Sequence, residues 1–166
     1  MSLLTEYVRV IRGFNRDIWF FLGSSASLSF AYLGVMGVLL NLYLLRLGYG
    51  PTFIGLLIGS GQLLWAALAL PAAALGLRIG PRNTMAAGST LVATGTGLII
   101  LVESSPSGWW SPWLIGSWLL LWTGASLNTV NGIPLLMSLS RPEERNYAFA
   151  VQASVFALFA FLGSLV

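Results

Sequence analysis

The feature that most constrains this chain is the length of its uncharged apolar runs. The first extends from residue 18 to residue 45 without a charged side chain. Charged residues make up only 8% of the chain, whereas a soluble domain carries about 25%. So few charges cannot coat a soluble surface, and the run exceeds the roughly 20 residues that a helix needs to cross a bilayer. The sequence therefore predicts an all-α, polytopic membrane helix bundle whose first partner is the lipid bilayer.

Five such runs follow one another, separated by short polar turns. We expect transmembrane helices over residues 18–45, 51–75, 82–102, 112–137 and 147–166. Pro51 and Pro112 suit the first turn of a helix, where the missing N–H costs nothing. Residues 1–16 are predicted to be a cytoplasmic amphipathic tail. That tail either lies in the headgroup layer with its arginines toward anionic lipid or is solvated.

The distribution of arginine predicts the orientation. The chain has eight arginines and no lysine, and with five spans seven of the arginines share one side of the membrane while only Arg46 lies on the other. Because basic residues concentrate in cytoplasmic segments, the N-terminus is expected inside and the C-terminus outside. We expect a multi-pass protein of the bacterial inner membrane. The scattered arginines are typical of topology signals and not of a nucleic-acid-binding surface.

The absence of cysteine and histidine excludes several chemistries. The sequence has no means to form disulfides, thiolate nucleophiles, Cys/His metal sites or imidazole acid–base pairs. Without a histidine or lysine, no base can activate the serines between residues 24 and 29. We therefore expect no metal, no cofactor and no enzymatic activity. A membrane-embedded enzyme is poorly supported, because no acid pair or activated nucleophile lies at depth.

One short reversal, Ala73 to Arg82, carries a resemblance to a known family. Its sequence, Ala-Ala-Leu-Gly-Leu-Arg-Ile-Gly-Pro-Arg, is similar to the signature between spans two and three of the major facilitator superfamily, Gly-x-Leu-Ala-Asp-Arg-x-Gly-Arg-Arg/Lys. The positions that match are Leu75, Arg78, Gly80 and Arg82. Leu77 stands where the family has an acid that is thought to help latch the outward-open state.

Two further stretches resemble the same family. Residues 46–55 look like its first outer turn, and Arg141-Pro142-Glu143-Glu144-Arg145 looks like the loop before span five, with Asn146 in place of a glycine. The resemblance implies an incomplete N-terminal half of a secondary transporter for a small molecule, with the missing C-terminal half as its partner. It makes Leu75, Arg78, Gly80 and Arg82 gate residues, and Arg141, Glu144 and Arg145 inner-loop residues.

Polar residues inside the runs are the candidates for a substrate cavity. Asn128 and Asn131 share one helix face; they form either a polar cavity wall or hydrogen bonds that bridge neighbouring helices. Gln62 has the same two interpretations. Tyr32 and Asn41 become cavity candidates because the resembling family lines its cavity with spans one and four.

Four finer expectations follow from the pattern. Gly55 and Gly59 form a small-xxx-small pair that predicts a close helix contact. Residues 140–143 fit the S-x-x-E capping pattern at the start of a helix. Asparagines toward the ends of spans one and four hint at an inverted three-plus-three repeat. No acid lies at depth, so proton coupling is expected outside this chain or absent.

The alternative function is a membrane scaffold or assembly subunit that does not transport.

Overall fold

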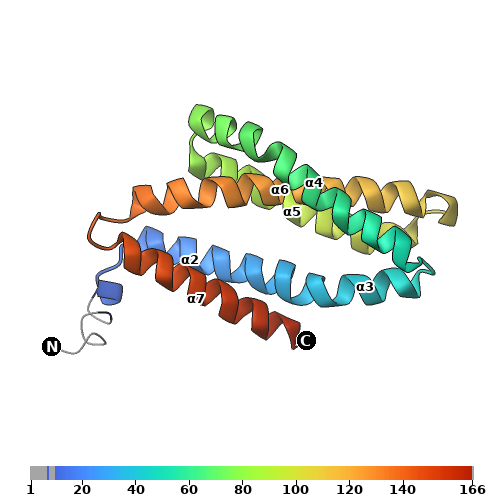
Figure 1. The fold of residues 1–166 in the computed structure, drawn as a ribbon, viewed down its shortest axis with the longest axis horizontal. Coiled ribbons are helices and arrows are strands. Elements are labelled where there is room, and N and C mark those ends of the chain that lie inside the picture. Colours follow the sequence, from blue (N-terminus) through green and yellow to red (C-terminus); the bar gives the residue numbers. More distant parts are fainter. Residues whose placement is uncertain (1–6, 8–9, 166) are drawn as a thin grey trace. The chain divides into compact units, whose positions relative to one another are not determined.

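The computed structural model describes residue 7 and residues 10–165, and every regular element in that part of the chain is helical. This confirms the predicted all-α class. The elements are α2 (Arg16–Leu28), η1 (Ser29–Met36), α3 (Gly37–Arg46), α4 (Pro51–Ile79), α5 (Pro81–Ile100), η2 (Leu101–Ser104), η3 (Ser107–Trp109), α6 (Trp110–Leu139) and α7 (Arg145–Ser164) (Figure 1).

Four helical segments are long and apolar enough to cross a membrane: Arg16–Arg46, Pro51–Ile79, Pro81–Ser104 and Arg145–Ser164. They make the chain a multi-pass membrane protein. The remaining predicted span is α6, which has 30 residues and the necessary length. Its asparagines, serines and tryptophans lower its mean hydropathy, so it does not belong to this group.

The chain divides into two compact units, each described here by itself. Unit 1 comprises residues 1–49 and 136–166, and unit 2 comprises residues 50–135. Unit 1 therefore contains the first and last helical segments, whereas unit 2 contains α4, α5 and most of α6. Residues far apart in sequence thus meet inside unit 1, where α7 runs alongside α2 and η1 (Figure 1).

The first span in unit 1 is not a uniform α-helix. Its middle, η1, is a π-helix between α2 and α3, a wider coil that is rare and often found at functional sites. Here Gly34 packs directly against Gly163 of α7, and a side chain on either glycine would collide with the opposite backbone. Nearby, the Ser29 hydroxyl donates a hydrogen bond to the Phe156 carbonyl. The sequence did not predict the change of helix type.

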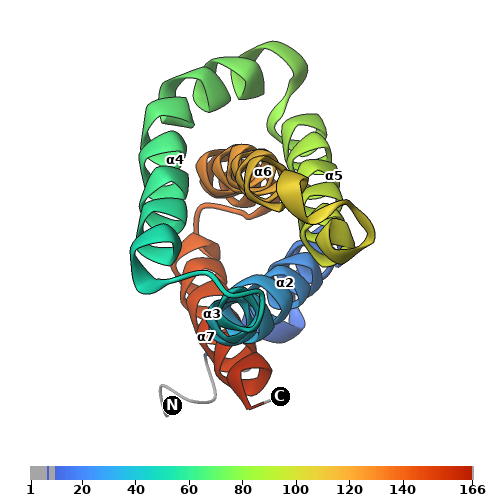
Figure 2. The same cartoon turned by 90° about the vertical axis from the view of Figure 1, so that its right-hand side faces the viewer.

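In unit 2, α6 lies between α4 and α5 (Figure 2). The contact with α5 again uses glycine: a Cβ on Gly95 would come within 2.8 Å of Leu121. Gly88 and Gly124 approach each other in the same way. Small residues allow helix backbones to approach closely, which is the main source of helix association within lipid. Gly55 and Gly59, expected to play this role, face open space.

Two glycines form the turns on either side of α4. Gly48 (φ 88°) and Gly80 (φ 86°) adopt left-handed backbone conformations that side chains with a Cβ rarely tolerate. The second reversal is tighter than expected, because α4 continues through Arg78 to Ile79 and α5 begins at Pro81. Only Gly80 separates the two helices, so most of the predicted loop from Ala73 to Arg82 is helical.

The predicted cap at Ser140 is wrong. The Ser140 hydroxyl donates to the Leu136 carbonyl of the preceding helix at 2.7 Å, so it serves the end of α6 and not the beginning of α7. The N-cap of α7 is Glu144, which makes no side-chain capping bond. The S-x-x-E pattern failed because the serine has a carbonyl within reach one turn behind it.

The glycine contact in unit 1 makes a direct prediction. Gly34→Val should destabilise the chain by about 1–3 kcal/mol, because an added side chain must push α7 away from the π-helix. Gly23→Val is the matched control, since a Cβ at Gly23 meets nothing within 4 Å. Thermal unfolding in detergent micelles, followed by circular dichroism, measures both. Equal losses for the two variants would contradict the proposed importance of the contact.

Candidate functional site

Asn131 on α6 is a buried polar residue of unit 2, with 3% of its surface exposed. Its amide nitrogen donates to the Ala72 carbonyl of α4 at 3.1 Å and to the Leu127 carbonyl of its own helix at 2.9 Å. The amide oxygen lies against Gly76 of α4, at a point that a Cβ would occupy. Asn131 therefore connects α6 to α4.

Asn128 has the equivalent position toward α5. It is 5% exposed, and its amide nitrogen donates to the Gly124 carbonyl at 3.1 Å. Its amide oxygen accepts from the Ser89 hydroxyl of α5 at 3.2 Å. A Cβ on Gly88 would come within 2.8 Å of the Asn128 amide nitrogen. Of the two interpretations left open for these asparagines, the helix-bridging one describes their contacts in unit 2.

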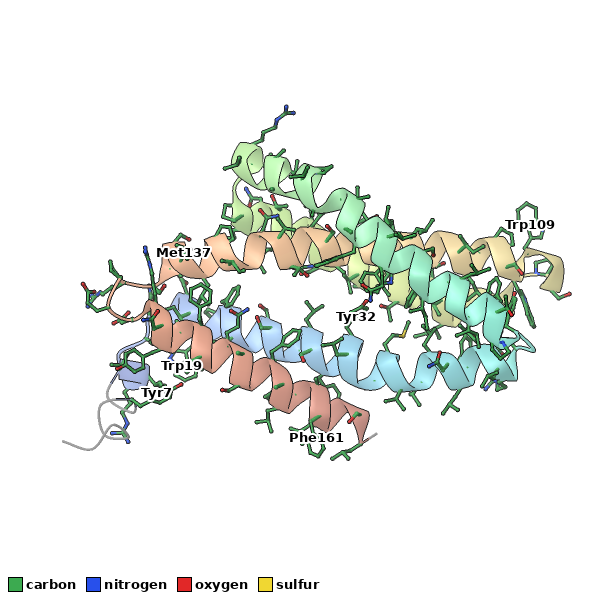
Figure 3. The ribbon with its side chains drawn as sticks, viewed as in Figure 1. Tyr7, Trp19, Tyr32, Trp109, Met137 and Phe161 are labelled. Atoms are coloured by element: carbon green, nitrogen blue, oxygen red, sulfur yellow. The ribbon has the colours of Figure 1, made fainter. Side chains whose placement is uncertain are left out.

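The other three cavity candidates differ in exposure and do not form a cluster within one unit. Tyr32 is half-buried in the π-helix of unit 1, and Asn41 is exposed on α3. Gln62 is exposed near the middle of α4 in unit 2. Figure 3 shows Tyr32 on the first span of unit 1. Gln62 and Asn41 thus keep polar amides on the surface of long apolar helices, where lipid or an aqueous cavity can contact them.

Two tryptophans that the sequence reasoning did not select occupy the contact between α4 and α6. Trp118 and Trp122 pack edge to face with ring centroids 5.8 Å apart. Both indole nitrogens lie against Gly61, where a Cβ would overlap them. Their spacing of one helical turn was visible in the sequence, but only the opposing glycine shows that these rings face protein.

The family-like turn is an exposed corner of unit 2. Arg78 and Arg82 are exposed, while Leu75 and Gly80 are half-buried. The Asn83 amide donates to the Ile79 carbonyl at 2.9 Å, and the Thr84 hydroxyl donates to the Gly80 carbonyl at 2.9 Å. These bonds satisfy carbonyls at the end of α4 and leave both guanidinium groups to contact partners outside the turn.

The loop before α7 belongs to unit 1. Arg145 donates to the Met137 carbonyl at 3.3 Å, which connects the start of α7 to the end of α6. Arg141 is exposed and Glu144 is half-buried. A cation beside the last carbonyls of a helix is favourable because it opposes the negative end of the helix dipole. The hydrogen bond from Arg145 to Met137 therefore stabilises the connection between α6 and α7.

The part of the tail that the structure describes is attached to the same end of unit 1. The Tyr7 ring meets Tyr147 of α7 edge to face at 5.4 Å (Figure 3). Arg16 lies over the Phe20 ring, with 5.0 Å between the guanidinium carbon and the ring centroid. Residues 1–6, 8 and 9 of the predicted tail lie outside the described residues. Within residue 7 and residues 10–165, no group of three or more metal-ligating side chains occurs.

The contact between α4 and α6 has a definite register. The Ser126 hydroxyl of α6 donates to the Trp65 carbonyl of α4 at 3.2 Å. The second bond, from Asn131 to the Ala72 carbonyl, lies five residues later on α6 and seven residues later on α4. Both contacts advance in the same chain direction, so the two helices run parallel.

Unit 1 repeats this register in its own parallel pair. Its first contact joins the Ser29 hydroxyl to the Phe156 carbonyl, and its second joins Gly34 to Gly163. The steps are again five residues on the helix that carries the serine and seven residues on its partner. In this register Asn131 occupies the position that Gly34 has in unit 1, so the register does not align Asn41 with Asn128 or Asn131.

Comparisons of the chain with protein-family models, curated proteins and solved structures give no match. The functional argument therefore rests on the residues themselves.

The close fit of Asn131 and Gly76 predicts a coupled pair. Gly76→Ala should displace the Asn131 amide and break its bond to Ala72, which costs about 0.6 kcal/mol on average for such bonds in membranes and at most about 1.7. In an Asn131→Ala background the same substitution should cost almost nothing. A double-mutant cycle of unfolding free energies in micelles measures this coupling. Gly59→Ala, at a position facing open space, is the control, and equal costs of Gly76→Ala in both backgrounds would refute the coupling.

Proposed function

We propose that this chain is part of a secondary transporter of the major facilitator type, which moves a small molecule by alternating access. The observation that carries the proposal is the contact register shared by the two parallel helix pairs. The first pair consists of the first and fifth helical segments, and the second of the second and fourth. The partner in transport would be the second half of the same transporter.

The two pairs are the ones that an internal repeat would relate. If spans one to three correspond to spans four to six, then span one corresponds to span four and span five to span two. A contact between spans one and five then implies an equivalent contact between spans four and two. Inverted repeats of three spans occur within each half of major facilitator transporters. The serine-to-carbonyl bonds Ser29–Phe156 and Ser126–Trp65 fit this relationship.

The motif resemblance supports the same proposal independently. The stretch around Gly48 and the stretch around Gly80 both form tight glycine turns between long helices, as the family signatures require. The segment from Arg141 to Arg145 connects the fourth long helix to the fifth. Three weak motifs thus occur at the three connections where the family carries them.

The cavity candidates take different roles under this proposal. Gln62, Tyr32 and Asn41 remain candidates for substrate contact, whereas Asn128 and Asn131 hold α6 against its neighbours. Two acids, Asp17 and Glu103, belong to the long helical segments, and they lie near the ends of those segments. A proton-coupling carboxylate would therefore belong to the other half, or coupling would use another ion. Arg78 and Arg82 would act in gating without the acid that Leu77 replaces.

The alternative proposal is a scaffold or assembly subunit that does not transport. The observation that favours it is that Asn128 and Asn131 each make a hydrogen bond to a neighbouring helix. In such a protein the polar side chains exist only for packing, and no polar residue faces an aqueous cavity. Gln62 distinguishes the two functions, because packing within unit 2 leaves it exposed.

The native chain has no cysteine, so single-cysteine variants test the proposal cleanly. In the presence of the second half of the transporter, Gln62→Cys should react with a charged, membrane-impermeant thiol reagent from either side of sealed vesicles, since an alternating-access cavity opens to each side in turn. Leu63→Cys, the neighbouring position and 75% exposed, should stay protected because an exposed apolar position faces lipid. The measurement is the labelling rate in right-side-out and inside-out vesicles.

Three results would contradict the transporter. Protection of Gln62→Cys from both sides would favour the scaffold, since position 62 would then face lipid or protein. Labelling of Gln62→Cys from one side only would indicate a fixed opening and no alternation. Equal labelling at positions 62 and 63 would show general exposure of α4 to water and would exclude a defined cavity.

A further inference from the structure

The turn between α4 and α5 concentrates positive charge without a counter-charge. Arg78 and Arg82 stand on either side of Gly80, and both side chains are exposed. Unit 2 contains a single acid, Glu103. Glu103 lies in η2, at the far end of α5 from the turn. Unit 2 therefore cannot neutralise its own arginines.

The two arginines differ in how their helices accommodate them. Arg78 lies in the last turn of α4, where the negative end of the helix dipole favours a cation. Arg82 lies in the first turn of α5, where the positive end of the dipole disfavours one. The nearby polar side chains Asn83 and Thr84 donate to backbone carbonyls. Nothing in unit 2 offsets the cost at Arg82, and an anion from outside would.

The apolar residues of the turn indicate what kind of anion this is. Leu77 is 89% exposed and Ile79 is 46% exposed, and they alternate with Arg78 along the end of α4. The turn joins two helices that are long enough to cross a membrane, so it lies at the level of the lipid headgroups. Guanidinium groups bind phosphate through paired N–H donors. A ligand that satisfies both features has a phosphate head and an apolar body.

We propose that the α4–α5 turn binds an anionic phospholipid, with Arg78 and Arg82 on the phosphate and headgroup and with Leu77 and Ile79 against the upper acyl chains. Leucine at position 77 is then part of the site, because an acid there would compete with the lipid phosphate for the arginines. This proposal is independent of transport and holds equally for a scaffold. The lipid would fix the depth and tilt of the α4–α5 hairpin in the bilayer.

The test is lipid binding by the full chain in neutral detergent micelles, measured by native mass spectrometry together with thermal stability. Phosphatidylglycerol should bind saturably and raise the melting temperature, whereas phosphatidylcholine should do neither. Arg78→Gln/Arg82→Gln should lose both effects. Arg46→Gln/Arg141→Gln removes the same charge from two exposed arginines of unit 1 and should keep them. Leu77→Asp should weaken binding without removing either arginine.

Three outcomes would overturn the proposal. Equal phosphatidylglycerol binding by the two double variants would show that net charge, and not this turn, attracts the lipid. The same stabilisation by inorganic phosphate would show a site for a free anion. Unchanged binding by Leu77→Asp would remove the apolar residue from the site. If Arg78→Gln/Arg82→Gln does not fold, Arg78→Lys/Arg82→Lys keeps the charge, and undiminished binding by that variant would contradict paired guanidinium contacts.

Discussion

Association of helices within lipid depends on close packing, because lipid tails are as apolar as the helix surfaces and no hydrophobic effect drives the helices together. In this chain, glycines lie at the points where neighbouring helices approach most closely. Gly34 meets Gly163, Gly88 meets Gly124, and Gly76 meets the Asn131 amide. The close approach brings serine and asparagine side chains within reach of carbonyls on the next helix. The hydrogen bonds between helices therefore depend on the close packing, and a side chain added at one of these glycines disturbs both.

The shared register extends this arrangement to both units. In each parallel pair a serine hydroxyl reaches a carbonyl near the middle of the partner helix, and a second contact follows at the same spacing. The second contact is made by glycines in unit 1 and by an amide in unit 2. The spacing of the contacts and the direction of the helices are thus repeated in both units, whereas the groups that make the second contact differ. Helix packing depends on where the backbones approach, so sequence similarity between two repeats can fade while their contacts persist.

The fold class and the approximate bounds of all five long helices could be predicted, because charge-free runs of this length have few alternatives in water or lipid. Where a local sequence pattern fits two different structures, the sequence could not show which of them forms. The Gly55/Gly59 pair has the same spacing as an interface motif, yet Gly61 and Gly76 are the glycines of α4 that contact α6. Ser140 could cap either of two helices. The π-helix at Ser29–Met36 packs against Gly163, a residue of the last helix, and no local pattern predicts that contact.

The candidate site shows the same limit more sharply. Asn128 and Asn131 have the spacing of a polar helix face, and a sequence cannot tell whether water, substrate or another backbone lies opposite that face. Gly88 and Gly76 decide the question, since each leaves a space that an asparagine amide fills. The arginines of the α4–α5 turn are the reverse case, because no partner approaches them within unit 2. Buried amides whose bonds are satisfied hold helices together, whereas exposed cations without a counter-charge attract something from outside. That contrast separates the structural polar residues of this chain from those available for binding.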